Sequence, residues 1–104
     1  MRNPRFHKLL DEIKELHDKK NTDYAVDKDP FSNFRECEKI GIPAYKGIMV
    51  RMSDKWSRLC NLISKDSEGN YESIEDTFKD LAVYSLIAYL MYQDNKGRKQ
   101  NKTK

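Results

Sequence analysis

Cysteine is scarce in this chain, and a hydrophobic run of membrane-spanning length is absent. Only Cys37 and Cys60 are present, so a disulfide scaffold is not expected, and both thiols are expected to be reduced in a cytoplasmic protein. No signal peptide is recognisable, and no membrane partner is expected. No stretch has the pattern of a β-strand, which leaves an all-α fold as the expectation.

The apolar fraction is also low, at 38%, against a charged fraction of 36%. Because the apolar residues are concentrated at helical spacing, this composition predicts a folded protein with a heavily charged surface. At 104 residues the chain has room for one domain with a modest core, and oligomerisation would add to its stability.

Four helices are expected from the apolar periodicity, over residues 4–20, 30–40, 44–64 and 71–93. Three are long and one is short, which favours a small all-α bundle with largely antiparallel neighbours. Residues 1–93 would form this single helical domain. The last eleven residues, 94–104, hold five basic residues, one acid and no apolar residue, so a disordered basic tail is expected there rather than an arm that binds nucleic acid.

The helix expected over residues 71–93 has two different halves. Its first half carries carboxylates four residues apart, Glu72, Asp76 and Asp80. From residue 81 to residue 92 only Ser85 interrupts an apolar run, so this half is expected to be buried on every side. So small a bundle cannot bury that many faces, and we expect a homo-oligomer, by default a dimer. The residues expected in its interface are Leu86, Ile87, Tyr89, Leu90 and Met91.

A basic stripe runs along the surface of the helix expected over residues 44–64. Arg51, Asp54, Lys55 and Arg58 occupy one sector beside the apolar face, since residues three and four apart stack on one side of a helix. Guanidinium and ammonium groups suit phosphate oxyanions, so the stripe is a candidate phosphate-binding wall. The alternative is a solvated charged face in which Asp54 pairs with Arg58.

The segment that follows residue 20 lacks helical periodicity and is expected to be a loop. Asn21, Asp23 and Tyr24 offer an amide, a carboxylate and an aromatic ring with a phenol, which could contact a base or a sugar. The alternative is that the amide and the carboxylate cap the preceding helix and form the turn, while Tyr24 fills the core.

Carboxylates of two helices could meet across a groove of this bundle. Glu12 flanks the apolar face of the first helix, and Asp76 and Asp80 lie on the last one. Facing carboxylates repel each other unless a divalent cation lies between them, and oxygen ligands combined with phosphates favour magnesium. With the basic stripe opposite, this arrangement would suit cleavage of a phosphoanhydride, with Asp76 and Asp80 as catalytic residues and all three acids as Mg²⁺ ligands.

Three sequence blocks resemble the signature motifs of a known family. The blocks are Lys20-Asn21-x-Asp23-Tyr24, Arg51-x-x-Asp54-Lys55-x-x-Arg58-Leu59 and Glu72-Ser73-Ile74-x-Asp76-Thr77-x-x-Asp80-Leu81-x-x-Tyr84. They look like those of the small phage and bacterial family called nucleotide modification associated domain 1, which itself resembles the all-α, MazG-like nucleoside triphosphate pyrophosphatases. The resemblance covers most of residues 7–93.

This resemblance implies an all-α protein that binds a nucleotide and acts in modified deoxynucleotide metabolism. The positions that match the family's motifs are Lys20, Asn21, Asp23, Tyr24, Arg51, Asp54, Lys55, Arg58, Asp76, Asp80 and Tyr84. Two positions depart from the pattern. Ala25 stands where glycine commonly follows the tyrosine, and Thr77 stands where the MazG-like enzymes have an acid three residues before Asp80.

Three functions are compatible with these residues. The first is an enzyme that acts on a phosphorylated nucleoside with the help of magnesium, and the family resemblance favours it. The second is a non-catalytic protein that sequesters a nucleotide signal, as a phage anti-defence protein would, and the missing acid at Thr77 favours it. The third is a helical interaction module whose buried polar residues only determine packing.

Overall fold

The structure, a computed structural model, describes residues 3–24, 32–65 and 71–102, with side chains described for residues 3–18, 34–65 and 71–97. The described residues form helices and no strand, so the expected all-α class is confirmed. The chain divides into two units, Met1–Asn33 and Phe34–Lys104, and each is described by itself. None of the described helices combines the length and the apolar character needed to cross a membrane.

The first unit contains one long helix, α1, which spans Pro4–Tyr24. Asn3 caps its N-terminus, because the side-chain oxygen Oδ1 accepts hydrogen bonds from the backbone N–H groups of Arg5, at 3.1 Å, and Phe6, at 3.2 Å. Proline at the first helical position fits this cap. The helix does not end near Lys20 but continues for about one more turn, so the loop expected at Asn21 was wrong for the backbone up to Tyr24.

A short 3₁₀ helix, η1, spans Ser32–Ile40, and its residues from Phe34 onward belong to the second unit. Gly41 ends it with a φ angle of 82°, a left-handed conformation that favours glycine. The N–H of Gly41 donates to the carbonyl oxygen of Glu38, and the N–H of Ile42 donates to that of Cys37, both at 3.1 Å. This pair of bonds is a Schellman motif, and it turns the chain into the next helix within three residues.

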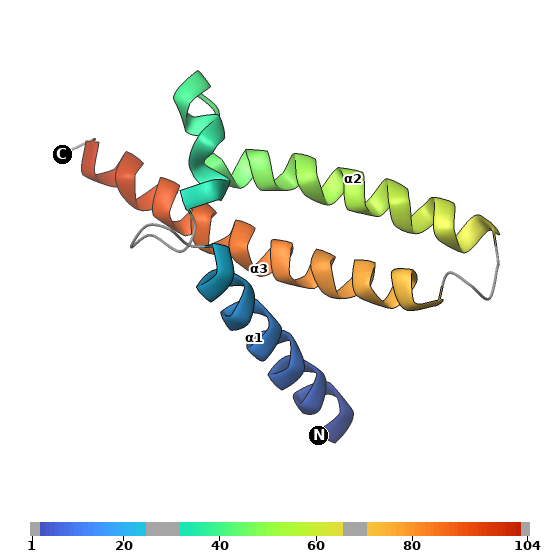
Figure 1. The fold of residues 1–104 in the computed structure, drawn as a ribbon. Coiled ribbons are helices and arrows are strands. Elements are labelled where there is room, and N and C mark those ends of the chain that lie inside the picture. The colour runs from blue at the N-terminus through green and yellow to red at the C-terminus, as the bar shows by residue number, and fades with distance from the viewer. Residues whose placement is uncertain (1–2, 25–31, 66–70, 103–104) are drawn as a thin grey trace. The chain divides into compact units, whose positions relative to one another are not determined.

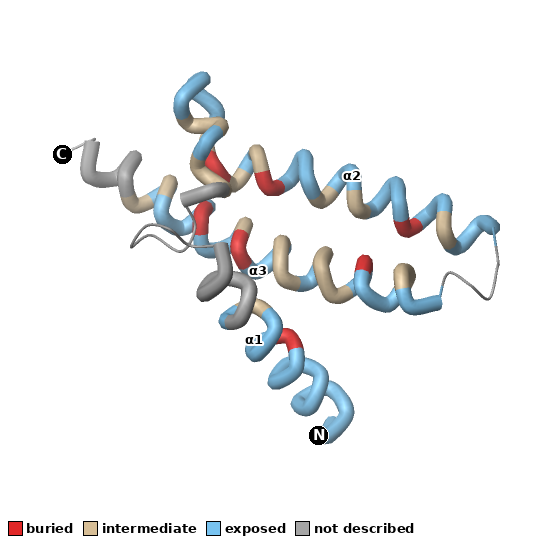
Figure 2. The backbone as a smooth tube through the Cα atoms, in the orientation of Figure 1, coloured by how far each residue is buried: buried red, intermediate tan, exposed pale blue. Residues whose placement is uncertain are grey.

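Two long antiparallel helices, α2 over Ala44–Lys65 and α3 over Tyr71–Lys102, pack side by side (Figure 1). We call this pair the hairpin. Buried residues recur along both helices (Figure 2), and they are Ala44, Ile48 and Leu59 on α2 and Thr77, Ile87 and Met91 on α3. They are four and eleven residues apart on α2 and ten and four residues apart on α3, which keeps them towards one side of each helix. The hydroxyl of Thr77 donates to the carbonyl oxygen of Ser73 at 2.6 Å, so this buried polar group is satisfied.

The last helix differs from expectation in length and in burial. It does not end at Gln93 but continues to Lys102, although a disordered tail was expected after residue 93. Its apolar half is not buried on every side either. Ile87 and Met91 are buried, whereas Leu86, Tyr89 and Leu90 are exposed, at 58%, 61% and 44%. An interface through all five of these residues is therefore not available, while the oligomeric state itself stays a prediction.

Candidate functional site

Charged residues of α2 and α3 come together on one side of the hairpin. Arg51, Lys55 and Arg58 follow one strip of α2, because they are four and three residues apart, and Asp76 and Asp80 are one turn apart on α3. The ammonium Nζ of Lys55 lies 3.2 Å from Oδ2 of Asp80. This ion pair places the basic strip of one helix beside the acidic strip of the other. We call the surface formed by these five residues the charged side.

The ion pair at its centre is only partly open to solvent. The side chain of Lys55 is 33% exposed and that of Asp80 is 30% exposed. Asp80 is therefore partly buried, and its ionic partner is a cation of α2. A pair with this exposure contributes on the order of 1 kcal/mol to stability. Its larger effect is positional, since it holds an ammonium group between the exposed residues Arg51 and Arg58.

An aromatic pair borders the charged side. The rings of Phe34 and Tyr84 meet edge to face, with centroids 6.1 Å apart. The guanidinium carbon of Arg51 lies 5.0 Å from the centroid of the Phe34 ring, within the range of a cation–π interaction. The structure therefore connects Arg51 to Tyr84, the one aromatic residue that the family resemblance assigned to the site in this unit.

Phe34 was not among the predicted site residues. It lies within the short helix expected over residues 30–40, and a phenylalanine at helical spacing carries no signal of a ligand site. Its position beside Arg51 and Tyr84 depends on the turn at Gly41, which directs η1 back onto the hairpin. No spacing in the sequence could have identified it.

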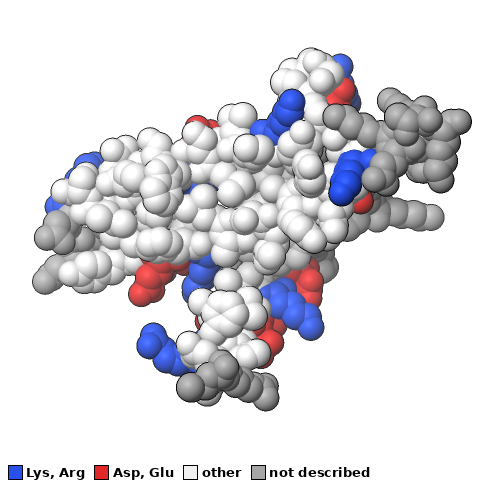
Figure 3. Space-filling view, turned by 180° about the vertical axis from the view of Figure 1, so that it is seen from behind, with Lys and Arg blue, Asp and Glu red and all other residues white. Residues whose placement is uncertain are grey.

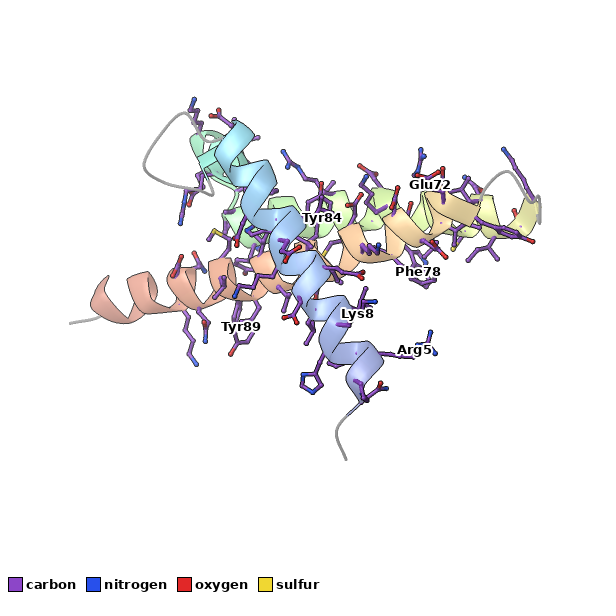
Figure 4. All side chains as sticks on the ribbon, turned by 60° about the horizontal axis from the view of Figure 1, so that its bottom comes forward. Arg5, Lys8, Glu72, Phe78, Tyr84 and Tyr89 are labelled. Carbon is purple, nitrogen blue, oxygen red and sulfur yellow. The ribbon has the colours of Figure 1, made fainter. Side chains whose placement is uncertain are left out.

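The remaining predicted residues of the hairpin are exposed. Asp54, Arg58 and Asp76 are open to solvent, as is Glu72 at the start of α3. In Figure 4, Glu72 and Tyr84 project to one side of α3, and Phe78 and Tyr89 project to the other. The charged side thus offers two exposed guanidinium groups and one fixed ammonium group to a ligand.

The four predicted binding residues of the first motif block, of which Asn21, Asp23 and Tyr24 were expected around a base or sugar, are not part of this description. The backbone of Lys20, Asn21, Asp23 and Tyr24 is helical, but their side chains lie outside the described residues. Their roles stay predictions. Glu12 is exposed on α1, in the first unit, and its role as a metal ligand also stays a prediction.

The described residues do not fit a magnesium site well. Nowhere in residues 3–18, 34–65 and 71–97 do three or more acidic, histidine or cysteine side chains gather where a metal ion could be held. Asp80 faces an ammonium group instead. Thr77, which stands in place of an acid, is buried, and an acid at that position would need a partner in the core. A magnesium ion on Glu12, Asp76 and Asp80 therefore stays a prediction.

Comparison with known proteins adds no relative. No family model, no curated protein and no solved structure matches this chain. The resemblance to the nucleotide modification associated domain 1 family therefore rests on the three motif blocks alone.

Proposed function

We propose that this protein binds a phosphorylated nucleoside on the charged side of the hairpin, within nucleotide metabolism or nucleotide modification. The observation that supports this most directly is the ion pair between Lys55 and Asp80, because it orients an ammonium group beside two exposed arginines. Three cations within two helical turns match the charge of a di- or triphosphate.

The proposed binding mode assigns a different task to each part of the site. Arg58 and Lys55 hold terminal phosphate oxygens, and Asp80 keeps the ammonium of Lys55 in place. Arg51, which already covers the Phe34 ring, offers its guanidinium to the inner phosphate. The edge-to-face pair of Phe34 and Tyr84 provides an apolar wall against which a base or sugar can pack.

Titration calorimetry with a mixture of nucleoside and deoxynucleoside triphosphates, followed by each binder alone, tests this proposal. Arg58→Ala is expected to weaken binding by about 1.5 to 3 kcal/mol, the range for hydrogen bonds to charged groups. Lys46→Ala is the matched control, because it removes one positive charge from another exposed side of α2. Equal affinities of the two variants would contradict a phosphate site on the charged side.

Sequestration without turnover is the second candidate. It is favoured by the engagement of Asp80 with Lys55 and by the burial of Thr77, which leave Asp76 and Asp80 poorly placed to share a metal ion. Chromatography of the bound nucleotide after incubation with magnesium separates the two candidates. An enzyme converts the nucleotide, and Asp80→Asn abolishes the conversion while the protein stays folded. A sequestering protein returns the nucleotide unchanged.

A further inference from the structure

The side of the hairpin opposite to the charged side carries a continuous row of exposed apolar residues. They are Met49, Trp56 and Ile63 on α2 and Tyr71, Phe78 and Tyr92 on α3, and each is between 51% and 61% exposed. We call these six residues the apolar face. Seen from behind the view of Figure 1, a broad surface over α2 and α3 is nearly free of Lys, Arg, Asp and Glu (Figure 3).

The spacing along each helix, combined with two contacts between the helices, places these residues on one side of the hairpin. The rings of Tyr45 and Tyr92 meet edge to face, with centroids 5.2 Å apart, and so join this flank of α2 to the same flank of α3. The ion pair between Lys55 and Asp80 joins the two opposite flanks. The hairpin therefore has one charged side and one apolar face, each built from both helices.

The residues of the apolar face recur at intervals of seven along each helix. On α2 the three residues are seven apart, and on α3 the positions 71, 78, 85 and 92 follow the same interval, with Ser85 as the only polar residue among them. A repeat of seven keeps a stripe facing a partner helix along its whole length. Ordinary exposed apolar residues are scattered singly and show no such register.

We propose that the apolar face pairs two copies of this chain back to back, as a four-helix arrangement of two hairpins. A two-fold dimer needs a surface that complements itself, and an uncharged stripe with the same interval on both helices meets this requirement. Large side chains offer on the order of 150 to 250 Å² each, so six of them half exposed provide roughly 450 to 750 Å² per protomer, which reaches the lower range of specific interfaces.

The same chemistry argues against a charged partner. A nucleic acid or an acidic protein would be recognised by cations, and the six residues of the apolar face include none. Pairing through this face also leaves the charged side of each copy open to solvent. The inference does not depend on the proposed nucleotide function, because it uses the opposite surface of the hairpin.

Trp56 makes the full-length chain its own probe, since it is the only tryptophan of the sequence. Light scattering at about 50 µM is expected to give twice the chain mass of 12.3 kDa. On dilution through the dissociation constant, the emission of Trp56 is expected to shift to longer wavelength as its ring becomes exposed. A monomer at about 50 µM, or a dimer whose emission does not change on dissociation, would overturn the proposal.

Matched substitutions locate the interface. Phe78→Glu is expected to give a monomer and to keep Trp56 as a reporter, whereas Val50→Glu and Leu86→Glu are expected to leave the dimer intact. These two controls are similarly exposed, at 63% and 58%, but lie off the apolar face. A dimer that survives Phe78→Glu, or one that Leu86→Glu dissociates equally well, rejects this face. Should Phe78→Glu fail to fold, the dilution of the unmodified chain decides. If Trp56 is shielded from solvent in a monomeric chain, another part of that chain or a bound molecule covers the apolar face, and the proposal is wrong.

Discussion

Gly47 lies where the thiol of Cys37 comes closest to α2. A Cβ atom at residue 47 would stand 2.7 Å from Sγ of Cys37, well inside van der Waals contact. The thiol also lies 3.8 Å from the carbonyl oxygen of Pro43, so it has little room to move away. Gly47→Ala is therefore expected to lower the free energy of unfolding by about 1 to 3 kcal/mol. Urea unfolding followed by circular dichroism measures this change.

Gly97 provides the control, because it also lies within a helix but has nothing within 4 Å of an added Cβ atom. Gly97→Ala is expected to raise the free energy of unfolding by about 0.5 to 1 kcal/mol, since alanine loses less backbone entropy. Combining Cys37→Ala with Gly47→Ala should recover most of the loss at residue 47. Equal stabilities of the two single glycine variants would contradict the close approach of Cys37.

Asp80 tests whether the charged side contains an ion pair or a metal site. Asp80→Asn removes the charge that faces Lys55, and we expect the free energy of unfolding to fall by about 1 kcal/mol, because both side chains are about one-third exposed. The exposed Asp76 is the control, and Asp76→Asn should change stability by less than about 0.5 kcal/mol.

Thermal melting with and without magnesium extends this test. If Lys55 is the partner of Asp80, magnesium leaves the melting temperature of the unmodified protein unchanged. A magnesium-dependent rise in melting temperature that Asp80→Asn abolishes would instead establish the metal site expected from the sequence. It would also show that Asp80 interacts more favourably with the magnesium ion than with Lys55.

At the scale of the element, the end of η1 depends on one backbone conformation. Gly41 has a φ of 82°, where a side chain costs about 1 to 2 kcal/mol. Gly41→Ala is expected to destabilise the protein by about this amount, and Gly41→Asn by less, because asparagine tolerates the left-handed region better. Two variants of equal and unchanged stability in denaturant titrations would show that the turn does not need glycine.

The length of α3 gives a second prediction at this scale. The helix continues for nine residues beyond Gln93, and Arg35 pairs with Asp94, with Nη2 and Oδ2 3.4 Å apart. A chain cut after Gln93 is expected to lose the far-UV dichroism of about that many helical residues and less than about 1 kcal/mol of stability. An unchanged helical signal would show that the residues after Gln93 are not helical in solution, in agreement with the disordered tail that the sequence analysis expected.

At the scale of the whole molecule, the two sides of the hairpin should respond in opposite ways to salt. Binding of a nucleoside triphosphate to the charged side is expected to weaken markedly between about 0.05 and 0.5 M sodium chloride, because counterions screen exposed cations. Self-association through the apolar face should persist or strengthen, and sulfate should favour it further. Calorimetry measures nucleotide binding and light scattering measures self-association across the same salt series. If both weakened as the salt concentration rose, the assignment of these two interactions to the two sides of the hairpin would be rejected.

The helices and several of their capping residues could be predicted from the sequence alone. Asn3 and Gly41 are caps whose chemistry is local, and apolar spacing is a property of single helices, so both could be read without a fold. Helix ends at Tyr24 and Lys102 were missed, because polar residues such as Lys and Gln continue a helix as well as they end one.

Which apolar residues form the core and which face outward depends on packing between the helices. Ile48 and Trp56 belong to the same broad apolar face of α2, yet the first is buried and the second is 61% exposed. Tertiary packing also decides that Lys55, and not Arg51, pairs with Asp80, and that Phe34 lies beside Arg51. The physical reason is that a helical projection gives directions within one helix only. Which direction meets a neighbour depends on how α2 and α3 are rotated against each other, and that rotation is set by packing between residues distant in the chain.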